Sequence, residues 1–464
     1  MLQYAMKIPE IIKKISKRVQ LNGAKAIIVG GSVRDHFLGL PIKDYDIEVY
    51  GLPSLEALSK ILEVYGSVNF VGKSFGVLKF VHEGVTYDFS FPRTEQKVGI
   101  GHRGFEVTCD GGISFELAAR RRDFTINAMG YDIESKVFLD PYGGREDIRQ
   151  QRLRHIDADR FVEDPLRVYR AVQFVARFGY LLDEETHRLC RWMVDEGMLE
   201  SLPKERIYEE FKKLLLRAPR PSVGFELMRS LGILQYYPEL KNLIGVPQSK
   251  KWHPEGDVWI HTMMAVDEMV KLQTGEEKQD LKMMLAILCH DLGKATHTQI
   301  RPDRISAIGH AKAGVPLSRR FLGRFTEDQG LTQGILPLVE HHLAPTTYYR
   351  TGANDSTIRK LATKVNIQEL VTVARADFLG RTTKMAQQGI YEAGDWLLKK
   401  AEELGVLTRP LRPFIQGRDL IALGLRPSKA FREILEELYR AQLHGEVCTK
   451  QEALARLKNV TMEA

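Results

Sequence analysis

The chain has 464 residues, 44% of them hydrophobic, and its 67 Lys and Arg against 60 Asp and Glu leave a net charge of +7. This composition excludes a mainly disordered chain, and no apolar run approaches the ~18 residues of a membrane span. We therefore expect about three domains, at about 150 residues each, and no membrane partner. A pI near 9.0 fits a nucleic-acid partner without establishing one.

The cysteines argue for a reducing compartment. They are four, lie far apart and form no CxxC motif: Cys109, Cys190, Cys289 and Cys448. This spacing predicts neither a disulfide framework nor a zinc ribbon. The start of the chain, residues 1–20, has the pattern of an amphipathic helix and lacks the apolar core of a secretory signal. We expect a cytoplasmic protein.

The first 140 residues mix strands with helices. In chain order we expect a buried strand over 24–31, a short helix over 32–39, a strand over 44–51 and a hairpin over 76–91 with its turn at Glu83-Gly84. From about residue 160 onward, apolar residues recur every three to four positions, which predicts helices almost throughout. The fold class is thus α+β, with a small mixed-sheet head followed by all-α parts.

Domain limits follow from the same pattern. A joint rich in Pro and Gly over 242–257 separates two helical blocks, and 409–414 has the composition of a linker. We expect a catalytic head, a helical neck, a histidine-rich helical domain and a helical tail, with the limits 1–140, 141–245, 246–400 and 401–464.

Two aspartates and two glycines mark the candidate site of the head. Asp44 and Asp46 are two residues apart, so on a strand both side chains share one face. Such a close pair of carboxylates favours a cation between them, and Mg²⁺ takes carboxylates together with substrate phosphates. A bare DxD pair is more often solvated at a strand end. Here, however, Gly30 and Gly31 precede it at a turn between strand and helix, where backbone N–H groups can approach a phosphate.

Four segments then resemble, in order, the motifs of the class II tRNA nucleotidyltransferase and poly(A) polymerase family. They are GGSVRDHFLGLPIKDYDIEVYG (30–51), RRRDFTINAM (120–129), DPYGGREDIRQQRLRHI (140–156) and EDPLRVYRAVQFVARFGY (163–180). The resemblance covers about the first 200 residues and implies a polymerase β-like nucleotidyltransferase head. Such heads usually hold a third catalytic carboxylate on a neighbouring strand, for which Asp88 is the candidate, although a plain hairpin-edge residue would look the same.

The resemblance also assigns roles along these motifs. It implies Mg²⁺ at Asp44 and Asp46, and nucleotide contacts by Gly30, Gly31, Arg34 and Arg170. It further implies that Arg122, Asp123 and Asn127 surround the ribose. The expected partners are tRNA, CTP and ATP.

Asp164 and Arg167 could choose the base. An aspartate that accepts from the amino group and an arginine that donates to the ring nitrogen would suit both C and A, whereas G and U present the reverse order. Each unsatisfied buried group costs about 1–3 kcal/mol. The alternative is that Asp164, placed before Pro165, caps a helix. In the family's EDxxR motif, this Asp and Arg act as the template for the base.

Two further segments bear on specificity and RNA binding. The polar segment 93–107 is either a surface loop or, as in the family, a flexible loop that helps to switch from C to A and argues against a CC-only enzyme. Residues 145–177 hold eight arginines. Some must pair with local acids, and the excess could follow the phosphates of a tRNA acceptor stem.

The second helical block carries an ordered set of histidines and aspartates. This set resembles the metal ligands of the HD phosphohydrolase superfamily, in the order His261, His290-Asp291 and Asp377. The extra ligands of the two-metal members of that superfamily are matched by His310 and His341. Lys294 is placed to meet a phosphate. Imidazole with carboxylate suits Ni, Mn, Co or Fe. The block also resembles the C-terminal domain of gammaproteobacterial CCA-adding enzymes, which implies hydrolysis of 2′,3′-cyclic or 2′-phosphate ends; residues 401–464 extend beyond that resemblance.

The expected function is template-free, Mg²⁺-dependent addition of CCA, or of its terminal A, to tRNA 3′ ends. An enzyme that adds only A would need a separate CC-adding partner, and a poly(A) polymerase would use ATP alone. Alternatives of other classes are an HD phosphohydrolase with a non-catalytic RNA-binding head and a pure RNA-binding protein.

Overall fold

The computed structural model describes residues 6–71, 76–97, 105–109, 111–423, 426–427 and 429–462. Its Cα trace separates into two compact units. The first comprises residues 1–218 and 223–233, and the second comprises 219–222 and 234–464. The four domain limits expected from the sequence stay predictions.

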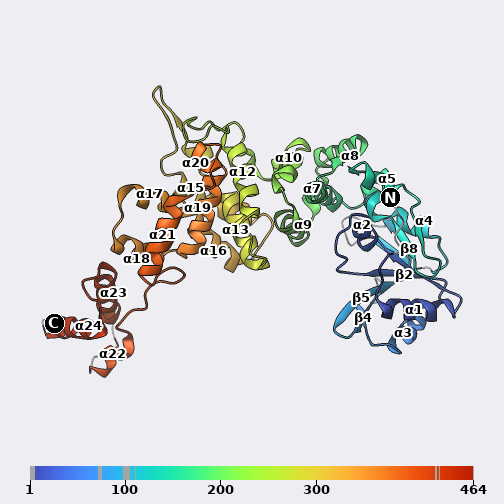
Figure 1. The fold of residues 1–464 in the computed structure, drawn as a ribbon, viewed down its shortest axis with the longest axis horizontal. Helices are drawn as coiled ribbons and strands as arrows, with labels where there is room; N and C mark the ends of the chain where they lie inside the picture. Colours follow the sequence, from blue (N-terminus) through green and yellow to red (C-terminus); the bar gives the residue numbers. More distant parts are fainter. Residues whose placement is uncertain are drawn as a thin grey trace. The chain divides into compact units, whose positions relative to one another are not determined.

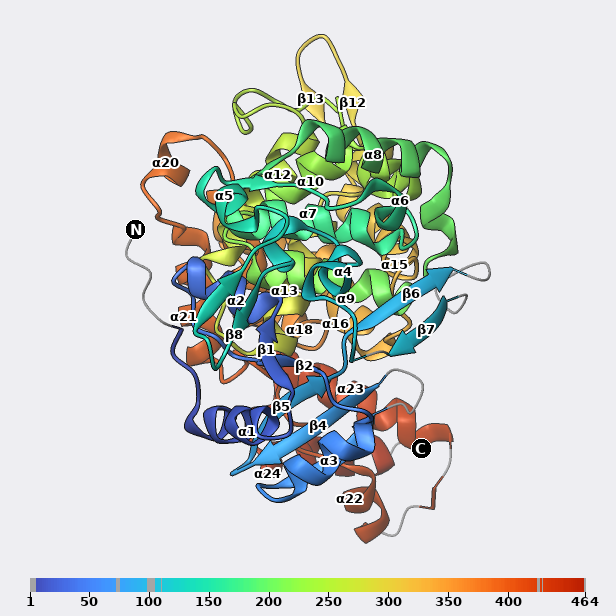
Figure 2. The same ribbon diagram turned by 90° about the vertical axis from the view of Figure 1, so that its right-hand side faces the viewer.

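The head is built on a seven-stranded mixed sheet. Its strands, in spatial order, are β3 (Ser67–Val71), β4 (Val77–His82), β5 (Val85–Ser90), β2 (Asp46–Tyr50), β1 (Lys25–Val29), β8 (Gly130–Asp132) and β9 (Val137–Leu139). The β2–β5 pair is parallel, and the other neighbours are antiparallel. β2, β5 and β4 lie side by side in Figure 2. The mixed-sheet head expected from the sequence is confirmed.

Local sequence explains one hairpin of this sheet and a separate two-stranded ribbon. The expected hairpin forms between β4 and β5, where His82 pairs with Val85. Its two turn residues both have positive φ, 50° at Glu83 and 79° at Gly84, as a tight two-residue turn between twisted strands requires. In the segment expected as a polar loop, β6 (Arg93–Lys97) and β7 (Phe105–Cys109) pair as an antiparallel ribbon, while residues 98–104 lie outside the described residues.

Two helices cover part of the sheet. The expected N-terminal amphipathic helix is α1 (Glu10–Gln20), which buries Ile12, Ile15 and Val19 completely. It packs on β1 and on α3 (Leu55–Glu63), and α3 contacts β3 and β4 (Figure 1). The core of the head therefore lies between α1, α3 and the sheet, and α2 (Gly31–Phe37) follows β1 directly.

Short helices lead from the sheet into the neck. They are α4 (Phe115–Arg120), α5 (Gly144–Arg149), α6 (Ala158–Phe161), α7 (Leu166–Phe178), α8 (Glu184–Asp195), α9 (Lys204–Arg217) and α10 (Pro221–Ser230). α7 and α9 pack closely. α7 buries nine of its thirteen residues, and Gly179 ends it in the left-handed conformation, as glycine commonly does.

The second unit is helical, as expected. Its principal helices are α12 (Val258–Val270), α13 (Glu277–Cys289), α15 (His310–Leu322), α16 (Gln329–His341), α19 (Ile367–Leu379) and α21 (Glu392–Glu403), with shorter ones between them: α11 (Pro238–Lys241), α14 (Lys294–His297), α17 (Ala344–Thr351), α18 (Asp355–Ala362) and α20 (Lys384–Gln387). α13 is the central helix, since Leu285, Ala286, Ile287 and Leu288 are all fully buried. It contacts α12, α16 and α19. A small hairpin of β12 (Gln299–Ile300) and β13 (Ile305–Ser306) follows α14.

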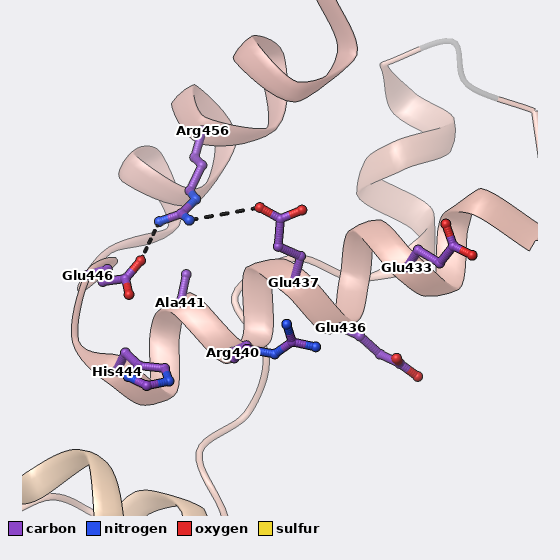
Figure 3. A pocket seen from close by; sticks show the side chains of 8 residues that line it. All are labelled: Glu433, Glu436, Glu437, Arg440, Ala441, His444, Glu446 and Arg456. Carbon is purple, nitrogen blue, oxygen red and sulfur yellow. Dashed lines mark hydrogen bonds and ion pairs between the residues drawn. The ribbon is translucent and has the colours of Figure 1, made fainter. Parts of the chain in front are cut away.

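The tail forms a small core of its own. Leu420 of α22 (Gly417–Ala422), Leu438 of α23 (Lys429–His444) and Leu457 of α24 (Lys450–Met462) are buried together. Figure 3 shows a pocket at α23 and α24 lined by both acidic and basic side chains, where Arg456 forms ion pairs with Glu446 (2.7 Å) and Glu437 (3.8 Å). Within the described residues, none of the helices is both long and apolar enough to cross a membrane.

Candidate functional site

Three carboxylates lie near one another where β2 begins, beside the middle of β5. Asp46 is the first residue of β2 and pairs in register with Asp88 on β5, while Asp44 lies two residues earlier in the preceding loop. The pKa of Asp46 is raised, because the carboxyl is partly desolvated and the charges of Asp88 and Asp44 repel its own; Arg122 opposes this shift. The parallel β2–β5 pairing thus joins two carboxylates that are far apart in the sequence.

The glycine turn is tied to these carboxylates. Gly30 has a φ of +71°, and a Cβ there would lie 2.6 Å from Nη1 of Arg122. Arg122 in turn donates from Nη2 to Glu48 (3.0 Å). Next to Gly31, the Ser32 hydroxyl donates to the backbone carbonyl of Asp44 (2.8 Å). The backbone conformation therefore favours glycine at position 30, and a side chain there would also displace the end of Arg122.

A buried polar chain joins the second motif to the first and fourth. Asn127 donates from Nδ2 to Asp123 (2.9 Å) and accepts at Oδ1 from Arg34 (2.7 Å). Arg170 donates from Nε to the other oxygen of Asp123 (2.6 Å). Burial opposes ionisation of Asp123, but Arg170 and Asn127 outweigh it and hold its pKa below the ordinary value. These four residues, all expected at the site, form one network.

Asp164 and Arg167 are both held by protein groups. Oδ1 of Asp164 accepts from the backbone N–H of Leu166 (3.2 Å), the first residue of α7, although Pro165 occupies the N-cap position of that helix. Both carboxylate oxygens also accept from Arg206 (2.9 and 3.2 Å), a residue that the sequence did not point to. Arg167 donates to the backbone carbonyls of Arg160 (2.6 Å) and Arg121. The two side chains are thus oriented before any nucleotide arrives.

The arginines of 145–177 are largely engaged inside the protein. At least five of the eight form ion pairs with carboxylates: Arg149, Arg152, Arg154, Arg160 and Arg170. Arg145 and Arg177 lie over the aromatic rings of Phe37 and Phe178. The excess available to follow an RNA backbone is therefore much smaller than the bare count implies.

In the second unit, five helices bring histidines and aspartates into one buried cluster. α12 carries His261, α13 leads into His290 and Asp291, α15 begins at His310, and α19 carries Asp377. Each of these five residues is at most 6% exposed. All five were predicted from the sequence as metal ligands, and the structure places them together.

The sixth position differs from the expectation. α16 ends at His341, which is only half-buried, and the next residue, His342, is 1% exposed and enters the cluster. His342 replaces His341 as the candidate ligand. Successive residues of a helix point about 100° apart, so only one of two adjacent histidines can face the interior. The sequence alone did not determine which of the two adjacent histidines is the candidate ligand.

Asp291 lies between two groups of histidines within this cluster. Its Oδ2 lies 3.1 Å from Nε2 of His290 and 3.8 Å from Nε2 of His261. Its Oδ1 lies 3.2 Å from Nε2 of His310 and 3.9 Å from Nε2 of His342. Two groups able to hold a cation therefore share one carboxylate. Asp377 belongs to the first group, with its Oδ1 3.0 Å from Nε2 of His261.

The electrostatics of the cluster fit cations. Nε2 of His290 and both oxygens of Asp291 are buried and make no hydrogen bond of good geometry, although His290, His310 and Lys294 lie within 3.2 Å of Asp291. Buried polar atoms in such a state are rare in proteins unless an ion or water completes the site. Burial would raise the pKa of Asp291, but His290 and Lys294 hold it well below the usual range. Burial and the neighbouring His290 and His310 lower the pKa of His342 to about 3. Ionised carboxylate and neutral imidazole are the forms that bind metals; at His290, by contrast, burial lowers the pKa but the neighbouring Asp291 and Asp377 outweigh it and raise it, so a metal there would have to displace a proton.

Close backbone packing makes this assembly possible. A Cβ at Gly293, in the HDLG turn, would lie 2.0 Å from the carbonyl oxygen of His310. Only glycine allows α15 to bring His310 so near Asp291. The glycine stands in the motif, but its partner, seventeen residues later in the sequence, is visible only in the structure.

Three polar residues around the cluster were missed or only partly foreseen. Glu255 binds Nδ1 of His261 (2.8 Å), which orients the ring with Nε2 toward the cluster. Arg381 donates to both oxygens of Asp377 (2.9 and 3.0 Å). Lys294 pairs with Oδ2 of Asp291 (2.7 Å). Glu255 was overlooked because its segment, HPEGD, has the composition of a linker.

A cavity of about 510 Å³ opens on the cluster. Its lining combines the cluster residues Asp291, His310, His342 and Asp377 with the cations Lys251, Lys294, Arg350, Arg381 and Lys384 and the aromatic residues Trp252 and Phe378. This excess of positive charge suits an anionic ligand of the size of a nucleotide.

Family models match three stretches of the chain. Residues 26–154 match the poly A polymerase head domain, 179–244 a model described as the probable RNA and SrmB-binding site of polymerase A, and 258–381 the HD domain. The chain is 36% identical over 370 residues to the Multifunctional CCA protein of Pasteurella multocida, an alignment that covers 77% of this chain and 84% of that protein.

Solved structures share the fold. The CCA-adding enzyme of Bacillus stearothermophilus in complex with CTP aligns over 98% of this chain and 99% of its own, with a TM-score of 0.66 and 21% identity. The Thermotoga maritima CCA-adding enzyme complexed with tRNA aligns over 97% of both chains, with a TM-score of 0.59 and 20% identity.

Proposed function

This chain belongs to the class II tRNA nucleotidyltransferase and poly(A) polymerase family, and from that premise we propose that it adds CCA to the 3′ ends of tRNA from CTP and ATP. It is a nucleotidyltransferase with an HD domain. We place it in the cytoplasm, in agreement with the free thiols of Cys190, Cys289 and Cys448.

The reaction is an in-line displacement. The 3′-hydroxyl oxygen of the tRNA attacks the α-phosphorus of the nucleotide, the bond to the β-phosphate breaks, and pyrophosphate leaves while the hydroxyl loses its proton. Asp44, Asp46 and Asp88 offer only oxygen ligands, which suits Mg²⁺. Mg²⁺ bound there would stabilise charge at the reacting phosphate. The position of Asp46 beside Asp88 and Asp44 supports this assignment, since crowded carboxylates favour a cation.

The remaining residues bind and orient the nucleotide. The turn at Gly30-Gly31 would receive the triphosphate, with Arg122 against Gly30 and Arg34 against Gly31. The chain of Arg34, Asn127, Asp123 and Arg170 is the proposed ribose-binding group. Asp164 would accept from the amino group of C or A, and Arg167 would donate to the neighbouring ring nitrogen.

One observation carries this proposal, the in-register pairing of Asp46 with Asp88 on parallel strands beside the Gly30 turn. It brings Asp88 beside Asp46, which is more than forty residues earlier in the sequence, next to the glycine turn and Asp44. A head that merely bound RNA would have no need of this arrangement.

The test uses three tRNA transcripts, ending before CCA, after C and after CC, with Mg²⁺ and with CTP and ATP separately and together. Extension of the first transcript to CCA is the expected result. Extension of the CC-ended transcript alone, by ATP alone, would show an A-adding enzyme that needs a CC-adding partner. Runs of A on unrelated RNA would show a poly(A) polymerase.

A second activity is supported by the cluster in the second unit. Two histidine groups that share Asp291, beneath a cationic cavity, favour hydrolysis of phosphate esters. We propose that the HD domain hydrolyses 2′,3′-cyclic or 2′-phosphate ends. His261, His290, Asp291 and Asp377 would hold one transition metal (Ni, Mn, Co or Fe), and Asp291, His310 and His342 a second.

The chain's own groups suit this reaction. Lys294 and Arg381 line the cavity and place positive charge where a phosphate would bind. Bound metal would supply a nucleophile from water and polarise the ester. Turnover of 2′,3′-cAMP with Ni²⁺ or Mn²⁺ is expected from the whole protein and not from His290→Ala. Equal turnover in both proteins, or none in either with any of the four metals, would contradict the proposal.

A further inference from the structure

Asp164 owes its orientation to an arginine from another helix. Arg206 lies in the first turn of α9 and reaches Asp164, just before α7, with Nη2 at 2.9 Å from Oδ2 and Nη1 at 3.2 Å from Oδ1. Two parallel hydrogen bonds between a guanidinium and a carboxylate fix the plane of the carboxylate as well as its position. The side chains are 32% and 28% exposed, so the pair borders solvent.

The pair contributes little to folding. Ion pairs that are about a third exposed add little to stability because water screens them. α7 and α9 are also held together by apolar packing, for example between Tyr169 and Phe211, whose ring centroids are 6.2 Å apart. A structural role alone therefore does not account for a two-pronged clamp on this particular carboxylate.

The number of acceptor positions on the Asp164 carboxylate shows the effect of its two hydrogen bonds from Arg206. A carboxylate has about four acceptor positions. Arg206 occupies two of those on Asp164, and the backbone N–H of Leu166 occupies a third, on Oδ1. The position that remains is on Oδ2. The amino group of an incoming base can then donate only to this position on Oδ2. A base that carries a carbonyl oxygen there would face the same carboxylate oxygen, because the carboxylate is held and cannot rotate.

We propose that Arg206 is a positioning residue that makes Asp164 selective for C and A over U and G. This inference rests on the base-reading role proposed for Asp164 and Arg167. Without Arg206 the carboxylate can rotate, and the penalty for a carbonyl oxygen at that position falls. The chemistry at Asp44 and Asp46 does not involve Arg206 and stays intact.

The experiment measures kcat and KM for CTP and for UTP with the full-length protein, Mg²⁺ and a tRNA transcript that lacks CCA. Arg206→Met is expected to lower the ratio of kcat/KM for CTP over UTP by about tenfold, as for the loss of one hydrogen bond, with kcat for CTP within about threefold of the parent. Arg206→Lys is expected to recover only part, since lysine cannot supply the two-pronged contact. Arg188→Met, an arginine 75% exposed on α8, is the matched control and should change nothing.

A double-mutant comparison separates this inference from its premise. Asp164→Ala should lower the CTP preference, and adding Arg206→Met to it should have no further effect. If Asp164→Ala lowers the preference and Arg206→Met does not, the role of Arg206 is refuted while the proposed function stands. If Asp164→Ala leaves the preference unchanged, the base-reading role fails and the inference with it. Equal loss of CTP and UTP use in Arg206→Met, with a lowered melting temperature, would show a purely structural residue.

Discussion

The candidate transfer site of the head and the cluster of the HD domain both assemble ligands for metal-dependent chemistry at phosphate, in opposite surroundings. Asp44 and Asp46 are exposed where β2 begins, and Arg122 lies against the glycine turn beside them. His261, His290 and Asp291 are at most 1% exposed inside a bundle of helices. The first site is made of oxygens alone, and the second combines imidazole with carboxylate.

The difference follows from what each site must accommodate. An open set of carboxylates leaves room for a triphosphate, whose oxygens complete the coordination of Mg²⁺. A buried set of histidines and aspartates has its geometry fixed by helix packing and needs few ligands from a substrate. The two sites should therefore respond independently to substitution, and metal removal should affect the fold of the HD domain more than that of the head.

The largest effect is expected at Asp46. Asp46→Asn removes a charge from the carboxylate set and should reduce incorporation of CTP and ATP into tRNA by about a thousandfold or more, since metal stabilisation of the reacting phosphate amounts to several kcal/mol. Hydrolysis of 2′,3′-cAMP should stay at the parental rate. Single-turnover incorporation and steady-state hydrolysis measure the two activities.

The control for Asp46 is Glu83→Gln, an exposed acid in the turn between β4 and β5, which should retain both activities. A fall of less than tenfold in Asp46→Asn would show that Asp46 does not take part in the transfer.

The converse substitution is Asp291→Asn. Because Asp291 faces both histidine groups, its loss should lower the affinity for both metals by at least about a hundredfold and abolish hydrolysis. CCA addition should remain within about twofold of the parent. Metal content after dialysis, measured by mass spectrometry, gives a readout that does not depend on activity.

Loss of one metal only in Asp291→Asn would contradict the shared carboxylate. Loss of CCA addition together with hydrolysis would contradict the independence of the two sites.

The adjacent histidines give a matched pair. His342→Ala should reduce the bound metal toward one equivalent and slow hydrolysis by about ten- to a hundredfold, because His342 lies 3.9 Å from Oδ1 of Asp291. His341→Ala should stay within about twofold of the parent, since the ring lies outside the cluster. Metal stoichiometry and the rate of 2′,3′-cAMP hydrolysis distinguish the two variants, and the reverse order would restore His341 as the ligand.

The smallest effect is expected at Gly30. Gly30→Ala introduces a Cβ 2.6 Å from Nη1 of Arg122 at a φ of +71°. The strain and the displaced arginine should raise KM for CTP about tenfold. Gly23→Ala is a matched control, because Gly23 has a similar φ of +75° with nothing near its Cβ position. An unchanged KM in Gly30→Ala would show that the nucleotide does not approach this turn.

Much of the molecule could be predicted from local patterns. Alternating and helical periodicities predicted β1, β2, the β4–β5 hairpin and α1 because such patterns depend on neighbouring residues alone. The spacing of Asp44 and Asp46 and the order of His261, His290, Asp291 and Asp377 brought forward the residues of both candidate sites. The sequence thereby determined the kind of chemistry, since residue types limit the ligands that a site can offer.

Only the tertiary structure decided how these residues meet. The parallel pairing of β2 with β5 set Asp88 opposite Asp46, and packing in the second unit turned His342, and not His341, inward. Glu255 and Arg206 contact His261 and Asp164 through side chains that no local pattern links. Such contacts join residues between six and more than forty positions apart, and their geometry depends on how whole elements pack.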